Sequence, residues 1–204
     1  MNQTSSHKRI LRMVQIALLS ALVLVIHFFF AQARIGIIEM NFCLIPIVIA
    51  GAYIDPLAGF IVGAFSGIAT FYQVLTIGGS LYTLLVNTNV VVTALLCFLK
   101  VSLAGLLCGF VFRLLRKFKL NPFLSSLIAS AVCPIVNTAI FCLGMFTVFA
   151  PALIASPDFV GDNIFNIVIF VLVGPNFFVE LLSTVIITPI LGQALISAKV
   201  FKNV

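Results

Sequence analysis

The sequence predicts an all-α integral membrane protein, a compact bundle of six transmembrane helices that forms a single membrane domain over residues 1–204. Hydrophobic residues make up 63% of the chain and its mean hydropathy is +1.31, both far above the values of soluble globular domains. Charged residues make up only 8% and gather at a few places. The uncharged segments between them are the predicted spans, because about 20 helical residues cross a hydrocarbon core of about 30 Å.

The six predicted spans lie near residues 10–31, 35–54, 56–75, 83–112, 122–149 and 164–198. Two starts are well marked, because an Asp-Pro pair at 55–56 and an Asn-Pro pair at 121–122 each combine a capping side chain with a proline that suits the first helical turn. The last segment is too long for one straight span of about 20 residues. We expect Pro175 and Pro189 to break or kink it, and its outer part to be a loop or a re-entrant piece.

The basic residues predict the orientation. They gather in the N-terminal tail, between the fourth and fifth spans, and in the C-terminal tail: Lys8, Arg9 and Arg12; Arg113, Arg116, Lys117 and Lys119; Lys199 and Lys202. With six spans these clusters share one side, which the positive-inside rule assigns to the cytoplasm, and Asp158 and Asp162 fall on the other. The prediction is N-in and C-in. The net charge of +6 then reflects anchoring and contact with anionic membrane lipid, and we expect no nucleic-acid partner.

The N-terminus allows one alternative. Basic residues, an apolar run and the sequence AQAR at 31–34 resemble a secretory signal with a small-residue cleavage site. The apolar run from Met13 to Phe30 is longer than the ~7–15 residues of a typical signal core. We therefore expect the first span to be retained.

No motif for catalysis or metal binding is present in the sequence. The P-loop, GxSxG and HExxH patterns are missing, and the five cysteines lie in apolar segments without CxxC spacing. We expect the cysteines to act as small hydrophobic residues and His27 to be a packing or hydrogen-bonded residue. The sequence predicts no enzyme, no catalytic residues, no cofactor and no metal site.

Small residues recur at four-residue spacing in three predicted spans. They are Ala17 and Ala21 in the first span, Gly59, Gly63 and Gly67 in the third, and Gly105 and Gly109 in the fourth. Such stripes let helices approach closely in lipid. We predict internal packing for the glycines, while the alanine pair fits either internal packing or contact with another subunit.

Polar residues inside the spans predict a second feature. Lys100 lies thirteen residues before Arg113, a depth of about 20 Å, past the bilayer midplane. At about 100° per residue, Asn89, Thr93 and Lys100 share one face of the fourth span, opposite Gly105 and Gly109. Asn137 on the fifth span lies about 24 Å deep and Glu180 on the sixth about 28 Å, and Asn176 shares a face with Glu180 at a spacing of four residues.

Buried charge costs about 2.5–3.5 kcal/mol on insertion scales, so Lys100 and Glu180 are expected to face protein or water. We predict that these polar groups line one outward-opening cavity. The alternative is that Lys100 and Glu180 pair directly and only fix helix packing; their estimated depths differ by about 9 Å.

Several segments together resemble a known family. They are the Ala17-x-x-x-Ala21 pair, NFCLIPIVIAGAYIDPLAGFIVGAFSG at 41–67, LKVSLAGLLCGFVFRLLRK at 99–117, NTAIFCLGMF at 137–146 and NFFVELLSTVIITPIL at 176–191. Over residues 10–198 the chain resembles the substrate-binding S-component of energy-coupling-factor (ECF) vitamin transporters. The overall pattern looks closest to the pantothenate-type branch.

The resemblance implies a multi-pass protein of the prokaryotic cell membrane that binds a vitamin or related micronutrient at its outer side. It also implies partners, namely a transmembrane coupling subunit, which Ala17 and Ala21 would contact, and two ATPase subunits. Segment 72–86 would close over the ligand, with Gly78 and Gly79 as hinge. The expected substrate-binding residues are Lys100, Asn89, Thr93, Asn137, Asn176, Glu180 and Tyr82.

The identity of the ligand is less constrained. A cationic Lys100 suits a small carboxylate such as pantothenate, and the lack of tryptophan, with only three tyrosines, disfavours a large stacked ring. The 21 phenylalanines are able to stack instead. Two other interpretations remain open: an ion-coupled secondary transporter or small channel that uses Lys100 and Glu180, although no inverted repeat is evident, and a membrane scaffold without ligand.

Overall fold

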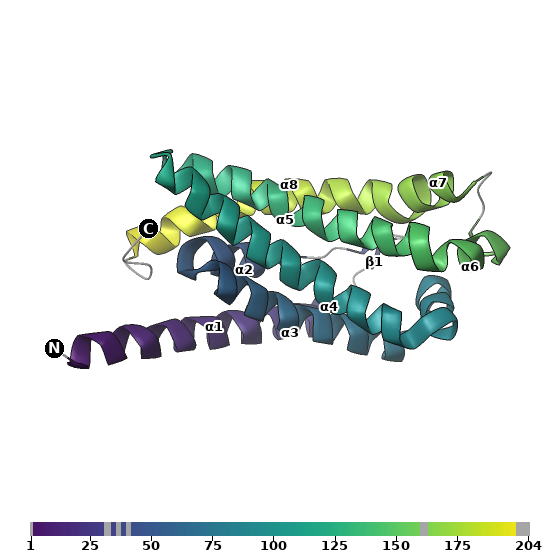
Figure 1. Cartoon of the computed structure of the whole chain (residues 1–204), viewed down its shortest axis with the longest axis horizontal. Helices are drawn as coiled ribbons and strands as arrows, with labels where there is room; N and C mark the ends of the chain where they lie inside the picture. Colours follow the sequence, from purple (N-terminus) through teal and green to yellow (C-terminus); the bar gives the residue numbers. More distant parts are fainter. Residues whose placement is uncertain (1, 31–33, 36–37, 40–41, 160–162, 199–204) are drawn as a thin grey trace.

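The computed structural model describes residues 2–30, 34–35, 38–39, 42–159 and 163–198 (Figure 1). The elements, with η for a π-helical segment, are α1 (Asn2–Phe30), β1 (Arg34–Ile35), β2 (Ile38–Glu39), α2 (Leu44–Ile49), η1 (Ala50–Ile54), α3 (Pro56–Thr76), α4 (Ser80–Lys117), α5 (Pro122–Gly144), η2 (Met145–Phe149), α6 (Ala150–Ala155), α7 (Ile164–Asn166), η3 (Ile167–Val173) and α8 (Gly174–Ser197). The two short strands pair antiparallel, with Arg34 opposite Glu39. The fold is an α-helical bundle.

Five helices in the described residues are long and apolar enough to cross a membrane. They cover Ser6–Phe29, Pro56–Thr76, Ser80–Lys117, Pro122–Ala155 and Asn176–Ser197. In place of the predicted span over 35–54, the structure has a short apolar helix, Leu44–Ile54. At about 1.5 Å per residue this helix is about 16 Å long, roughly half of a hydrocarbon core. The prediction of six full-length spans is therefore not confirmed.

The packing of α1 against α3 shows where this short helix lies in the path of the chain. Arg12, in the first half of α1, pairs with Asp55, the N-cap of α3. Farther along both helices, the His27 side chain contacts Ser66 and Gln73. Helices α1 and α3 therefore run parallel. The chain between them has to return to the end of the bundle where α1 began, and α2 with η1 forms the last part of this return.

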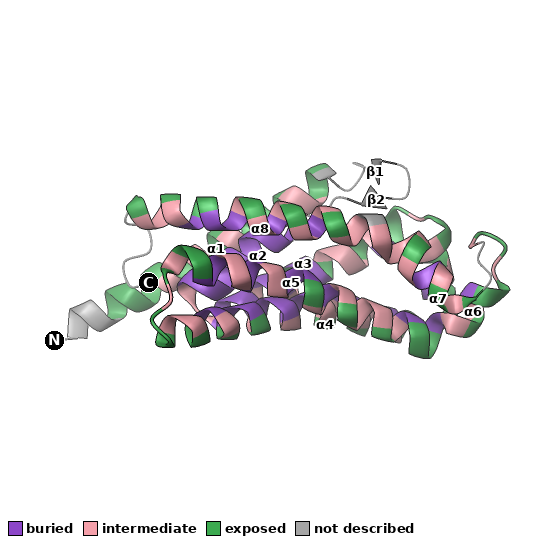
Figure 2. Ribbon diagram, turned by 90° about the horizontal axis from the view of Figure 1, so that it is seen from above, coloured by how far each residue is buried: buried purple, intermediate pink, exposed green. Residues whose placement is uncertain are grey.

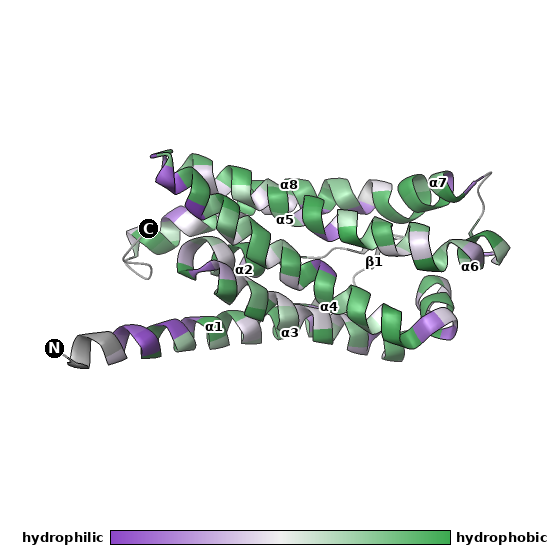
Figure 3. Ribbon diagram, viewed as in Figure 1, coloured by the Kyte–Doolittle hydropathy of each residue, from purple (hydrophilic) through white to green (hydrophobic). Residues whose placement is uncertain are grey.

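The remaining long helices alternate in direction. Figure 1 shows the N-terminus, the junction of α4 and α5 and the end of α8 at one end of the bundle, with α6 and α7 at the opposite end. Lys8, Arg9 and Arg12 thus share an end with the basic residues of 113–119, and we name it the basic end. Figure 3 shows the hydrophilic residues of α1 and of the α4–α5 junction there. Lys199, Lys202 and Asp162 lie outside the described residues, and the N-in, C-in orientation stays a prediction.

Two helix starts at the basic end form as the sequence predicts. The Asp55 carboxylate accepts a hydrogen bond of 2.8 Å from the backbone N–H of Ala58, and Pro56 opens α3. The Asn121 side chain accepts one of 2.9 Å from the Phe123 N–H, and Pro122 opens α5. Each cap satisfies a backbone donor that the first helical turn leaves unpaired.

The glycines of α3 and α4 lie where the two backbones touch. A Cβ atom on Gly63 would lie 2.7 Å from the carbonyl oxygen of Val101, and one on Gly67 would lie 2.7 Å from the Cα of Phe98. Gly59 and Gly105 face each other so closely that neither has room for a side chain. Because these contacts are with backbone atoms, the helices would have to move apart to admit even a methyl group.

The helix over the predicted span 83–112 is longer than predicted and is interrupted in the part farther from the basic end. Helix α4 begins at Ser80, after Gly78 and Gly79 with φ of 71° and 124°, and most of segment 72–86 is helical. The helix is interrupted at Asn89, whose φ and ψ are −164° and 101°. The Asn89 side chain accepts a hydrogen bond of 3.1 Å from the Val92 N–H and so caps the part of α4 that follows.

The last predicted segment, 164–198, is helical nearly throughout. The π-helical η3 precedes Gly174 and Pro175, and α8 then runs through Pro189 to Ser197. Proline lacks the N–H that a regular helical turn needs, which accounts for an irregular turn beside Pro175. The part before Gly174 is therefore helical rather than a loop; the predicted alternative, a re-entrant piece, stays a prediction.

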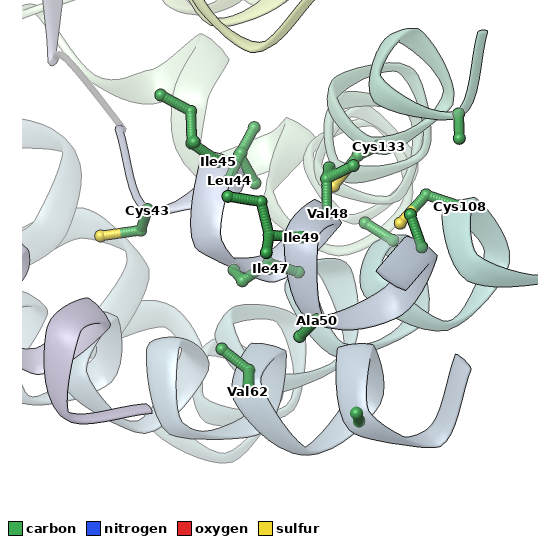
Figure 4. Packing of buried hydrophobic residues seen from close by; sticks show 14 of the residues in the cluster. Cys43, Leu44, Ile45, Ile47, Val48, Ile49, Ala50, Val62, Cys108 and Cys133 are labelled. Carbon is green, nitrogen blue, oxygen red and sulfur yellow. The ribbon is translucent and has the colours of Figure 1, made fainter. Parts of the chain in front are cut away.

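The core lies along the middle of the bundle (Figure 2). Every residue of α2 is buried, and Figure 4 shows its side chains among Val62 of α3, Cys108 of α4 and Cys133 of α5. A second apolar cluster, farther from the basic end, includes Leu85, Met145, Phe149 and Leu153. The short helix α2 therefore fills the half of the bundle nearer the basic end.

Candidate functional site

A buried polar pair joins α5 to α8. The Asn137 amide donates a hydrogen bond of 3.4 Å from Nδ2 to Oε2 of Glu180, and both side chains are only 5% exposed. Cys133, one helical turn before Asn137 on α5, belongs to the apolar core that includes the α2 residues. The pair therefore lies near the end of α2 that faces away from the basic end.

Lys100 lies about one helical turn farther from the basic end. Its ammonium group sits 5.2 Å from the centre of the Phe141 ring, a cation–π contact. Phe141 follows Asn137 by four residues on α5, so the two side chains share a face about 6 Å apart. The half-buried Lys100 thus contacts a residue one helical turn along α5 from the Asn137–Glu180 pair.

Asn176 on α8 is related to Glu180 as Phe141 on α5 is related to Asn137. It precedes Glu180 by four residues, so its side chain lies on the same face, one turn farther from the basic end. Among the described residues, the buried side-chain oxygens of Asn137 and Asn176 have no hydrogen-bond partner. An unsatisfied buried polar atom costs about 1–3 kcal/mol, which a hydrogen-bond donor on a bound molecule would offset.

Three helices supply one cation, two amides and one carboxylate: Lys100 from α4, Asn137 from α5, and Asn176 and Glu180 from α8, of which Asn137 and Glu180 are in direct contact. This donor set suits a small molecule that carries an anionic group for Lys100 and hydroxyl or amide donors for the two amide oxygens. We call these four residues the polar site.

Three other predicted binding residues lie elsewhere on α4. The buried Thr93 hydroxyl contacts the carbonyl oxygens of Leu85 and Asn89, each at 2.9 Å, and so bridges the interruption in the helix. Asn89 is exposed and caps Val92, and Tyr82 is half-buried in the first turn. The interruption removes the common face on which the sequence placed Asn89 with Lys100.

Lys100 and Glu180 do not form a direct ion pair. Within the described part of the chain, Arg12 and Asp55 form an ion pair, with 2.6 Å between Nε and Oδ2. No contact of this kind links Lys100 with Glu180. Counting residues placed Glu180 about 9 Å farther out than Lys100. The contact of Glu180 with Asn137 and that of Lys100 with Phe141 instead place the two groups about one helical turn apart along α5, with Lys100 farther from the basic end.

Two side-chain contacts of the structure were not predicted from the sequence. Phe141 positions Lys100, but one phenylalanine among 21 carries no distinguishing signal. The Arg12–Asp55 pair was missed as well, although Asp55 is an acidic residue at the end of the bundle that carries the basic clusters. An isolated negative charge among basic residues is the sequence signal that indicates this ion pair.

The helix α1 presents an open face. Ala17 and Ala21 are exposed, together with apolar neighbours such as Leu18 and Phe28, while Ser20 and Val23 face inward. The His27 side chain holds the far part of α1, with Nε2 2.9 Å from the Ser66 hydroxyl and Nδ1 3.2 Å from the Gln73 amide oxygen. The alanine pair is thus available to another molecule.

Comparison with known proteins gives the family. The model of the family described as "ECF transporter, substrate-specific component" matches residues 11–192. No protein with a curated description and no solved structure matches the chain. This family contains transporter components rather than enzymes; its members are multi-pass proteins of the cell membrane that bind a small-molecule substrate and associate with coupling and ATPase subunits. The chain belongs to the family of ECF transporter substrate-specific components.

Proposed function

We propose that this substrate-binding subunit captures a small carboxylate vitamin, with pantothenate as the best candidate, in the polar site. The observation that carries the proposal is the position of Lys100 beside Phe141, one helical turn from the Asn137–Glu180 pair. A cation at this depth costs free energy unless it meets an anion or water. A ligand carboxylate would offset that cost through charge-assisted hydrogen bonds.

Pantothenate matches the rest of the polar site chemically. Beside its carboxylate it carries an amide N–H and two hydroxyl groups, which are able to donate to the side-chain oxygens of Asn137 and Asn176. Those oxygens have no partner among the described residues. Each new hydrogen bond would contribute about 0.5–1.5 kcal/mol.

For coupling to transport, we propose that Ala17 and Ala21 form the contact with the transmembrane coupling subunit. Both residues are exposed on α1, and their small side chains permit close helix approach. The basic end would face the cytoplasm, as the positive-inside rule predicts, and the polar site would then lie nearer the outer face. Substrate capture and coupling would occupy different depths of the same bundle.

Mass spectrometry of the ligand retained by the purified full-length chain tests the proposed substrate class. We expect a small carboxylate vitamin. A retained cation, or no binding of any member of a vitamin panel, would contradict the proposal.

Uptake separates this function from ion-coupled transport. Accumulation of labelled vitamin should require co-expressed coupling and ATPase subunits and should survive a protonophore. Accumulation by the chain alone that collapses with the proton gradient would instead favour a transporter that uses Lys100 and Glu180.

A further inference from the structure

A groove of about 520 Å³ opens at the basic end, and none of its lining residues belongs to the polar site. Its lining comes from α1, the start of α3 and the last third of α4, and includes Arg12, Asp55, Leu57, Leu106, Phe110 and Arg113. Arginine and apolar side chains therefore meet in one concave surface.

The charges of the groove do not balance. Both carboxylate oxygens of Asp55 are engaged: one accepts the hydrogen bond from the Ala58 N–H, and the other pairs with Arg12. Its side chain is 14% exposed, whereas that of Arg12 is 43% exposed. The contact with Asp55 uses Nε of Arg12, so the terminal nitrogens of that guanidinium remain for another acceptor.

Arg113 adds a second positive charge. It is exposed, and among the described residues no carboxylate lies within 4 Å of it. Two guanidinium groups with one carboxylate leave a net positive charge in the groove, and a guanidinium binds phosphate in a bidentate geometry. The charge of the groove is complementary to a phosphate.

The apolar lining indicates what carries the phosphate. Leu57 and Phe110 are 54% and 55% exposed, and with Leu106 they form the apolar part of the groove lining. A free phosphate gains nothing from these side chains. An acyl chain gains about 25 cal/mol for each Å² of apolar surface buried.

We propose that this groove binds an anionic phospholipid. The phosphate lies between Arg12 and Arg113, and an acyl chain lies along Leu57, Leu106 and Phe110. The site is independent of the ligand proposed above, because it shares no residue with the polar site.

The experiment is native mass spectrometry of the full chain released from nanodiscs of phosphatidylcholine, with or without phosphatidylglycerol. The wild type should retain phosphatidylglycerol in preference to phosphatidylcholine. Arg113→Gln should bind it about tenfold more weakly, the factor that corresponds to ~1.4 kcal/mol. Lys117→Gln, which removes an exposed charge of the same cluster outside the groove, should match the wild type.

A control and several outcomes decide the proposal. Unfolding temperatures in pure phosphatidylcholine identify any folding defect, and Arg113→Lys, which keeps the charge but loses the bidentate geometry, supplies a second variant with an intermediate effect. Equal losses in Arg113→Gln and Lys117→Gln would show diffuse attraction and overturn the proposal. Displacement of the lipid by inorganic phosphate alone would also overturn the proposal. So would an Arg113→Gln variant that retains the lipid as the wild type does but assembles more weakly with the coupling subunit.

Discussion

Replacing Gly63 by alanine tests whether the contact between α3 and α4 positions the polar site. The new Cβ atom would lie 2.7 Å from the Val101 carbonyl oxygen and 2.9 Å from the Cα of Ser102, whereas ordinary contact begins at 3.4 Å. The two helices would have to separate by about 0.7 Å, because both neighbours are backbone atoms. Overpacking of this kind costs about 1–3 kcal/mol.

Gly144→Ala is the matched control. There the new Cβ atom would meet the terminal methyl groups of Leu96 at 2.8 and 2.9 Å, and a flexible side chain is able to move aside. Both substitutions gain the same helix propensity, about 0.8–1.0 kcal/mol, so their difference isolates the backbone clash. We expect Gly63→Ala to unfold about 2–12 °C below Gly144→Ala, taking 2–4 °C per kcal/mol for a chain of this size.

The assay is thermal unfolding in detergent together with equilibrium binding of the ligand. Val101 is adjacent to Lys100, and a shift of about 0.7 Å exceeds the ~0.5 Å tolerance of a binding constellation, so Gly63→Ala should also bind more weakly. Equal unfolding temperatures and equal affinities for the two variants would refute the argument that this close contact fixes the place of Lys100.

Three further predictions concern other parts of the bundle. Ala17→Leu combined with Ala21→Leu should abolish co-purification with the coupling subunit and leave ligand affinity and stability unchanged, since both residues are exposed; assembly at the wild-type level would disprove the proposed contact. Asn89→Ala should lower stability by about 0.5–2 kcal/mol through loss of the cap, and Asn89→Ser should restore most of it in thermal unfolding; identical behaviour of the two variants would argue against a capping role. His27→Ala should raise hydrogen–deuterium exchange in the second half of α1, because it removes the contacts with Ser66 and Gln73, and unchanged protection there would count against this attachment.

Much of the fold was predictable because local rules govern it. The capping pairs at 55–56 and 121–122 start α3 and α5, and the four-residue glycine spacing lies where α3 meets α4. The short helix was not predictable in the same way. Apart from Glu39 and Asn41, residues 35–54 are mostly apolar, and hydropathy averaged over them does not distinguish a full span from a buried helix of half that length that begins at Leu44.

The polar site was predicted in part. Depth and periodicity selected Lys100, Asn137, Asn176 and Glu180, because an intramembrane polar group has to face protein or water. Asn89 was assigned to the same face by assuming a regular helix. An asparagine that caps an interruption and one that faces a cavity look alike in sequence, and only the backbone angles at Asn89 separate them.

Recognition of a carboxylate by Lys100 is tested most directly by the ratio of dissociation constants for pantothenate and for pantothenol, its primary-alcohol analogue. The wild type should bind pantothenate more tightly by about tenfold or more, since hydrogen bonds to charged groups contribute about 1.5–3 kcal/mol. Lys100→Met should bring the ratio close to one, and Lys117→Met, at the basic end, should leave it unchanged. A preference for pantothenate that survives in Lys100→Met would contradict the assignment of Lys100 as the ligand-binding cation.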